Sequence, residues 1–252
     1  MNSPLTRALS LSLLFSVTFA ELAQANTSPA KNESTGATSV SNGDGWHDLD
    51  RLTELYGEEA RWGIHRKNKR IGTHTVSFDE TDDALVVTIE SVIRVSVLKI
   101  PVYRFRYLAR ERWADGELMK ASATVTENGK VTHTLMRRNE DRTIMRGPDG
   151  ESEVPALQYA TNHWHAGVLE ASSVFNTITG TSNDVQITAD GSGQLEQIDG
   201  DALTYTRYRY DGQLNLESWY DDSGRWLGMR FPGEDGNPVE YRLESDAFAH
   251  AR

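Results

Sequence analysis

The chain has 252 residues, 38% of them hydrophobic and 25% charged, and a formal net charge of -11 at pH 7. This acidic balance argues against nucleic-acid binding, which depends on neutralising phosphates with lysine and arginine. The sequence contains no cysteine, which excludes disulfides, thiolate nucleophiles and cysteine-ligated metals.

The first 25 residues have the pattern of a bacterial secretory signal peptide. Arg7 precedes an apolar run over 8–20, and the small residues Ala-Gln-Ala at 23–25 suit cleavage before Asn26. The run is shorter than the ~20 residues that cross a bilayer, and no later segment reaches that length. We therefore expect a cleaved signal peptide, a periplasmic or secreted protein, and no transmembrane segment in the mature chain.

The rest of the chain divides into a linker and one domain. Residues 26–45 are rich in serine, threonine, asparagine and glycine, a composition that buries little apolar area and predicts a flexible linker. Residues 46–252 are predicted to form a single all-β domain. It opens with a short amphipathic helix over 48–56, which Gly57 ends.

Two long runs of strand-forming residues between Ala84 and Trp113 dominate this domain. In the first run, valine, leucine and isoleucine alternate with polar residues. In the second, the aromatic residues Tyr103, Phe105 and Tyr107 alternate with arginines. Strands of about 14 residues rarely stay flat, because right-handed twist accumulates along them. A strongly curved antiparallel sheet with its aromatic face inside is therefore predicted.

Turn signals fix how the strands follow one another. Asp115-Gly116 and Asn128-Gly129 are typical of two-residue hairpin turns, and successive hairpins imply an antiparallel meander. The pattern breaks over 157–173, where we expect one short helix and a loop. Strands are predicted to resume at 174–179, 185–189 and 194–198, followed by stronger ones to residue 243. The fold class is thus an all-β meander of long, curved strands, forming an open or partly closed barrel with one helix and loop insertion.

The alternating residues of the second run suggest a binding face. Tyr103, Phe105 and Tyr107, together with Trp164, are candidate contacts for an apolar ligand inside the curved sheet; packing in a filled core is the simpler explanation of the same aromatic residues. Arg104 and Arg106, continued by further arginines at 110 and 112, are candidates for binding an anionic headgroup. The alternative is a solvated outer face.

His163-Trp164-His165 is the strongest candidate for chemistry. If these residues were on a strand, both imidazoles would point the same way and could bind one metal ion. If they were in a loop, Trp164 would anchor the chain in the core and the histidines would be incidental.

The turn between the two long runs is unusually apolar. Residues 98–102 read Leu-Lys-Ile-Pro-Val and lack glycine, asparagine and aspartate. Exposed, this tip would contact a membrane or a partner. Alternatively, it would pack against another element, such as the 157–173 loop.

Several of these motifs occur in an order that resembles an exported bacterial family labelled domain of unknown function 6134. The resemblance covers about residues 60–244. It is carried by Gly63-Ile64-His65, Trp113-Ala114-Asp115-Gly116, His163-Trp164-His165 with Asn176-Thr177-Ile178-Thr179-Gly180, and Trp219-Tyr220-Asp221. The family usually has asparagine where this sequence has His165. The resemblance implies an exported all-β domain and transfers no catalytic residue and no cofactor.

Three functional hypotheses follow. The first is a non-catalytic envelope protein that holds an apolar or amphipathic, lipid-like ligand in the curved sheet without a cofactor. The second is a metal-dependent hydrolase built on His163 and His165. The third is a protein–protein interaction module of the cell envelope, which would use a sheet edge or the 98–102 tip.

Overall fold

The computed structural model describes residues 48–244 except 82, 99, 197–201 and 234. The predicted signal peptide and the 26–45 linker therefore lie outside the described residues. The elements in chain order are α1 (Leu49–Tyr56), β1 (Glu59–Arg66), β2 (Lys69–Thr81), β3 (Ala84–Val97), β4 (Ile100–Ala114), β5 (Glu117–Glu127), β6 (Lys130–Asn139), β7 (Arg142–Gly147), β8 (Gly150–Pro155), the 3-10 helix η1 (Ala166–Glu170), β9 (Ser173–Asn176), β10 (Thr181–Glu196), β11 (Ala202–Gly212), β12 (Leu216–Tyr220), β13 (Trp226–Pro232) and β14 (Pro238–Leu243).

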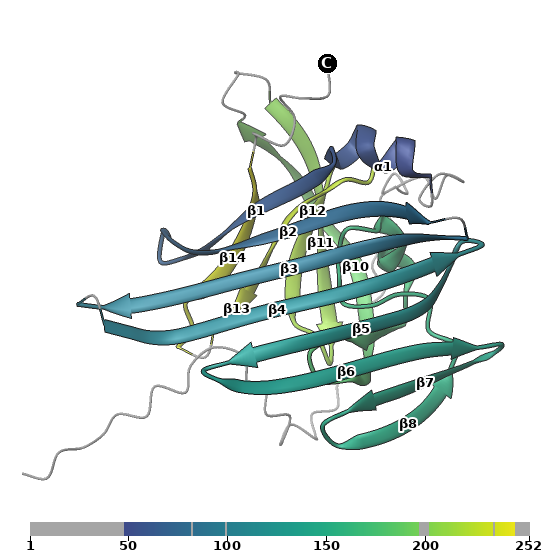
Figure 1. The fold of residues 1–252 in the computed structure, drawn as a ribbon. Helices are drawn as coiled ribbons and strands as arrows, with labels where there is room; N and C mark the ends of the chain where they lie inside the picture. Colours follow the sequence, from purple (N-terminus) through teal and green to yellow (C-terminus); the bar gives the residue numbers. More distant parts are fainter. Residues whose placement is uncertain (1–47, 82, 99, 197–201, 234, 245–252) are drawn as a thin grey trace, which may run out of the picture.

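All fourteen described strands belong to one antiparallel sheet, which confirms the predicted all-β meander. The strand order is β8-β7-β6-β5-β4-β3-β2-β1-β14-β13-β12-β11-β10-β9. Each strand pairs with its sequence neighbours, except that β1 pairs with β14, and β8 and β9 lie at the two edges. Figure 1 shows the sheet curling so that β10 to β13 cross behind the long strands β2 to β6. The result is an open barrel.

The long central strands have the face assignment that their alternation predicts. Leu85, Val87 and Ile89 of β3 are buried, and so are Tyr103 and Phe105 of β4. The arginines between the buried β4 residues face outward. Thus the inner face of this hairpin is part of the hydrophobic core, and its outer face is cationic.

The two edges of the sheet approach each other without forming a ladder. A β-carbon on Gly180 would lie 2.6 Å from the Cα of Gly147, so the turn between β9 and β10 is pressed against the end of β7. Thr134 of β6 donates a hydrogen bond to the carbonyl of Thr177 in the same turn, at 2.6 Å. Glycine at both contact positions permits an approach that any side chain would block.

The segment 156–172, which we call the plug, fills the inner face near one end of the barrel. It contains η1, in agreement with the predicted short helix and loop, and its side chains at 163–168 are buried. Helix α1 lies at the same end, capped by Asp48, and it buries Leu52, Leu55 and Tyr56 in the core. No helix in the described part of the chain is long and apolar enough to cross a bilayer.

One strand prediction was wrong. The sequence predicted separate strands at 185–189 and 194–198, but β10 is continuous from Thr181 to Glu196. Its pairing with β11 shifts register between Ala189 and Ser192, around Gly191, which has φ +92°. A bulge absorbs residues that the sequence suggested would form a turn.

The turn end of the β3–β4 hairpin, where β3 leads into β4, projects beyond the neighbouring strands β2 and β5 (Figure 1). The pairing of β2 with β3 stops at Ile93, and the pairing of β4 with β5 starts at Phe105. Residues 94–103, which we call the ribbon, therefore pair only within the β3–β4 ladder. Leu98 is 91% exposed and Ile100 65% exposed, while Lys99 lies outside the described residues. The alternative in which this tip packs against the 157–173 loop is wrong.

Candidate functional site

A buried carboxylate lies at the centre of the inner face. Glu111 of β4 is 1% exposed, and its side chain accepts hydrogen bonds from three donors. These are Nδ2 of Asn162 at 2.6 Å, Nε1 of Trp164 at 2.9 Å and Nε1 of Trp113 at 3.1 Å. Burial raises the pKa of Glu111, and the three donors oppose that rise. The carboxylate thus binds the plug to the central strand.

The network continues from Asn162 into the neighbouring strands. The Tyr107 hydroxyl donates to Oδ1 of Asn162 at 2.9 Å and lies 2.8 Å from Oγ1 of Thr177. Thr161 lies 3.1 Å from the same Thr177 hydroxyl. Burial raises the pKa of Tyr107 far above its ordinary value. These polar groups satisfy one another inside an apolar core, where an unpaired group would be costly.

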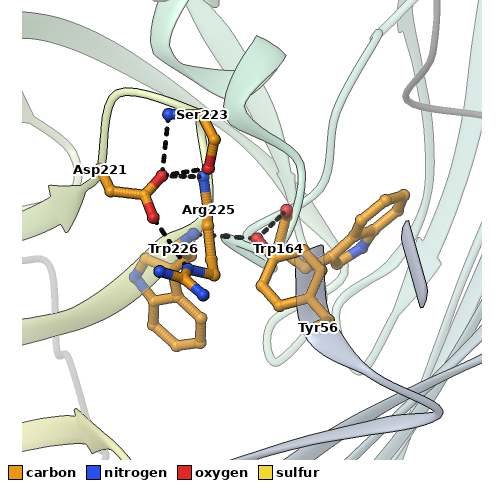
Figure 2. A network of polar contacts seen from close by, with 6 residues as sticks. All are labelled: Tyr56, Trp164, Asp221, Ser223, Arg225 and Trp226. Atoms are coloured by element: carbon orange, nitrogen blue, oxygen red, sulfur yellow. Dashed lines mark hydrogen bonds and ion pairs between the residues drawn. The ribbon is translucent and has the colours of Figure 1, made fainter. Parts of the chain in front are cut away.

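Trp164 is held by its backbone as well as by its ring. Its side chain is fully buried, and its carbonyl accepts a hydrogen bond from the hydroxyl of Tyr56 at 2.7 Å. Figure 2 shows that this hydroxyl also accepts from the backbone N–H of Trp226, at 2.9 Å. The phenol of α1 therefore joins the plug to β13.

The turn before β13 is organised by Asp221 (Figure 2). Its Oδ1 accepts from the backbone N–H groups of Ser223 and Arg225, both at 3.0 Å, while Nε of Arg225 donates to Oδ2 at 2.8 Å. Asp221 is 5% exposed. The carboxylate is fully used in fixing the turn, which places Trp226 against Tyr56.

His163 and His165 face different surroundings. The ring of His163 packs near Tyr210 and Trp226, and burial lowers its pKa to about 4. The ring of His165 stacks on Trp113, and its Nδ1 accepts from the backbone N–H of Gly167 at the start of η1, at 3.0 Å. The two side chains do not lie on one strand face. Among the described residues, no group of three or more histidine, aspartate or glutamate side chains is placed to hold a metal ion.

A third buried histidine lies beside this site. His74 of β2 is 7% exposed, and its Nδ1 lies 2.7 Å from the hydroxyl of Ser91. Its ring meets those of Trp62, Trp226 and Tyr241 edge-on. Burial, reinforced by the nearby His163, lowers the pKa of His74 to about 3. Both core histidines are therefore neutral at ordinary pH.

The predicted ligand contacts separate into two faces. Tyr103, Phe105 and Tyr107 are buried on the inner face, and Trp164 meets the same face through Glu111. Arg104 and Arg106 are exposed on the opposite face. The structure therefore brings the four aromatic residues to one side of the sheet and does not bring the two arginines to them.

Part of the inner face remains accessible away from the plug. The apolar side chains that pack against the core but are only partly buried include Val95, Met229 and Phe231. Val95 pairs directly with Tyr103 in the ribbon, and Phe231 contacts the ring of Tyr241. These residues extend the aromatic lining toward the end opposite the plug.

Sequence reasoning missed the central members of the site. For Glu111 the sequence does contain a signal: it is an acidic residue in the row of inward-facing apolar residues of β4, between Ala109 and Trp113. A lone acid on an inward face implies dedicated hydrogen-bond donors. The partners Asn162 and Tyr56 gave no such signal, because they reach the site from a loop and from a helix.

Comparisons with known proteins add family and fold. No curated protein matches the chain. Among solved structures, it is similar to a β-barrel-like protein of domain of unknown function DUF1849 from Brucella abortus, with 11% sequence identity and a TM-score of 0.50. The match covers 74% of this chain and 95% of that chain, and it shows a shared fold alone. A family model for a domain of unknown function, DUF6134, matches residues 62–244, from the first buried tryptophan of β1 to the end of β14. The chain therefore belongs to the DUF6134 family.

Proposed function

We propose that this protein is an exported bacterial envelope protein that binds an apolar or amphipathic, lipid-like molecule inside its curved sheet, without catalysing a reaction. The ligand would lie on the part of the inner face away from the plug. Tyr103 and Phe105 are its proposed contacts, with Tyr107 and Trp164 deeper in the barrel.

One observation carries the proposal. The inner face of the β3–β4 hairpin is apolar except for the buried Glu111 and Ser91, yet the plug and α1 cover only one end of it. At the other end Val95, Met229 and Phe231 remain partly exposed. Ligand sites are typically concave and apolar with a few fixed polar groups, and an open barrel offers that shape.

The polar network supports a binding role over a catalytic one. Glu111 is fully occupied by its three donors, and Asp221 by its turn. A general acid or base has to reach the proton that it transfers, and these carboxylates are committed to structure. Export is proposed from the N-terminal signal pattern.

The test begins with protein recovered from its own envelope. Native mass spectrometry is expected to show a mature N-terminus near Asn26 and a co-purifying lipid-like mass. Protein that still carries residues 1–20 would contradict export. Stoichiometric metal that is lost on His163→Ala would favour the hydrolase alternative instead.

Binding is then measured with a fluorescent fatty acid. Phe231→Ser removes a partly exposed inner contact, and we expect binding to weaken about tenfold, from the lost apolar burial. Arg230→Ser, on the neighbouring residue whose side chain pairs with Glu217, is the matched control and should bind normally. Absence of binding by the unaltered protein, or equal loss in both variants, would overturn the proposed site.

A further inference from the structure

We propose that the projecting ribbon and the outer face behind it form a docking surface for an anionic phospholipid membrane. This surface consists of Leu98, Ile100, Arg94, Arg104 and Arg106. The inference does not depend on whether the barrel holds a ligand.

The tip of the ribbon exposes large aliphatic side chains where other hairpins have polar ones. Leu98 and Ile100 are 91% and 65% exposed. The neighbouring tips carry Asn68 and Asn128, and the turn at the opposite end of β4 carries Asp115; all three residues suit turns. At the same end of the sheet, Val131, just after the Asn128 turn, is 53% exposed. Folding alone gives no reason to place apolar residues here.

The backbone of the tip is also held in a conformation that its residue disfavours. Leu98 has φ +51°, in the left-handed region. Asparagine, aspartate and glycine enter that region readily, whereas leucine rarely does. A strained apolar residue at an exposed turn points to a requirement for that side chain outside the fold.

Positive charge on the outer face is an independent reason to propose an anionic membrane as the partner. Arg94 and Arg104 lie directly opposite each other in the β3–β4 ladder, and the repulsion between their like charges disfavours that pairing. Arg94, Arg104, Arg106 and Arg110 are exposed and make no salt bridge with any described residue. Glu90 shares this face, but it lies nearer the middle of the strand. The same face continues across the neighbouring strands through Lys120, Arg137 and Arg112, of which Arg112 is paired with Asp83.

This cationic face occurs on a protein whose formal net charge is -11. Concentrating unpaired arginines on one outer face of an acidic protein indicates an anionic partner rather than general solubility. The arginines flank an apolar apex, so an approaching surface meets both at once. That combination is typical of segments that bind in the headgroup region of a bilayer.

A lipid surface fits this shape better than a protein. A stable protein interface buries about 800 Å² on each partner, far more than the two aliphatic side chains of a hairpin tip provide. A bilayer needs only shallow insertion of the apolar apex with cations beside it. The ribbon also extends past both neighbouring strands, so the rest of the sheet does not block its approach.

The test is sedimentation of the full mature protein with lipid vesicles. We expect binding to equal parts phosphatidylglycerol and phosphatidylcholine, little binding to phosphatidylcholine alone, and loss at high salt. Leu98→Ser with Ile100→Ser should weaken binding ~100-fold, about tenfold for each lost insertion. Neutralising Arg94, Arg104 and Arg106 to glutamine should also weaken it ~100-fold, about fivefold for each charge.

Matched controls are available elsewhere in the chain. Leu195→Ser removes a leucine that is 43% exposed near the β10–β11 connection, and Arg209→Gln removes an arginine on β11 that is paired with Asp190 and Asp211. Neither should change vesicle binding, and all variants should keep the melting temperature of the unaltered protein. No binding to anionic vesicles, equal binding to neutral ones, or equal loss in the controls would overturn the proposal.

Discussion

The two ends of the β3–β4 hairpin share one alternating sequence pattern and serve opposite roles. Near the plug, Glu111 and Trp113 lie under packed side chains, and the buried polar atoms of Glu111 are satisfied. In the ribbon, the strands lose both neighbours and the apolar Leu98 faces solvent. Period-two alternation identifies a strand and its inner face, but what that face meets depends on elements distant in the sequence.

This difference implies that stability and recognition are concentrated in separate places. Substitutions at the plugged end should change the free energy of unfolding and leave surface binding intact. Substitutions of the exposed Leu98 and Ile100 at the tip of the ribbon should do the reverse, because neither side chain is buried in the core.

The largest expected effect is at the plug. Trp164→Ala removes a fully buried indole and one donor to Glu111, and should lower the free energy of unfolding by about 3–5 kcal/mol. Urea denaturation measures it. Trp219→Ala, at a partly buried tryptophan on β12, is the matched control and should cost about 1 kcal/mol. Similar costs would show that the plug is peripheral to stability.

Substitutions on the two faces of β4 should differ nearly as much in their effect on the free energy of unfolding. Phe105→Ala should cost about 3–4 kcal/mol, because the ring is 4% exposed in the core. Arg104→Ala, on the adjacent outward residue, should cost less than about 0.5 kcal/mol. Denaturation of the two variants in parallel gives the comparison, and reversed sensitivities would contradict the assigned faces.

Acid should weaken the plugged end through its buried histidines. The pKa of His74 is lowered to about 3 and that of His163 to about 4, so the unfolded chain binds protons below pH 6.5 that the folded chain does not. Stability present above pH 6.5 is therefore lost as the pH falls, by about 2 kcal/mol for each histidine at pH 5.

Replacing one histidine isolates this effect. His74→Gln should flatten the fall in stability between pH 6.5 and 5 by about half of the histidine contribution. Glu111 contributes with the opposite sign, because its raised pKa makes stability fall as the pH rises, but that contribution is common to both proteins. Parallel slopes in the two proteins would mean that His74 does not titrate as proposed.

The smallest effect on stability is expected in the ribbon, where a substitution should make the protein more stable. Leu98→Gly relieves the left-handed backbone at φ +51° and should raise the free energy of unfolding by about 0.5–1 kcal/mol. Ile100→Gly, where φ is not positive, should give no such gain. A loss of stability on Leu98→Gly would show that the side chain packs against the fold after all.

Much of the fold follows from local sequence signals. The hairpin turns at Asp115 and Asn128, the two faces of β3 and β4, and the short helix ending at Gly57 are each determined by residues within a few positions. Such signals are read reliably because turn chemistry and strand period act locally. The prediction of two separate strands within β10 was wrong, because glycines occur in bulges as well as in turns.

The site was only partly predictable for a different reason. His163-Trp164-His165 was recognisable as a motif, but its surroundings depend on Tyr56 and Glu111, which are far from it in sequence. Nothing local shows that the two imidazoles face different aromatic groups. Contacts between a loop and the inside of a sheet come from tertiary packing, which periodicity does not encode.

The pairing of β1 with β14 also determines how the chain can fold. Every other ladder joins strands that are adjacent in sequence, so hairpins can form as soon as their residues are free. The β1–β14 ladder instead closes a loop that spans almost the entire domain, at an entropic cost that grows with its length. Until residues 238–243 are available, β1 and β13 both present open hydrogen-bonding edges. The two halves of the sheet are therefore joined last, and an incomplete chain would carry two sites for mispairing.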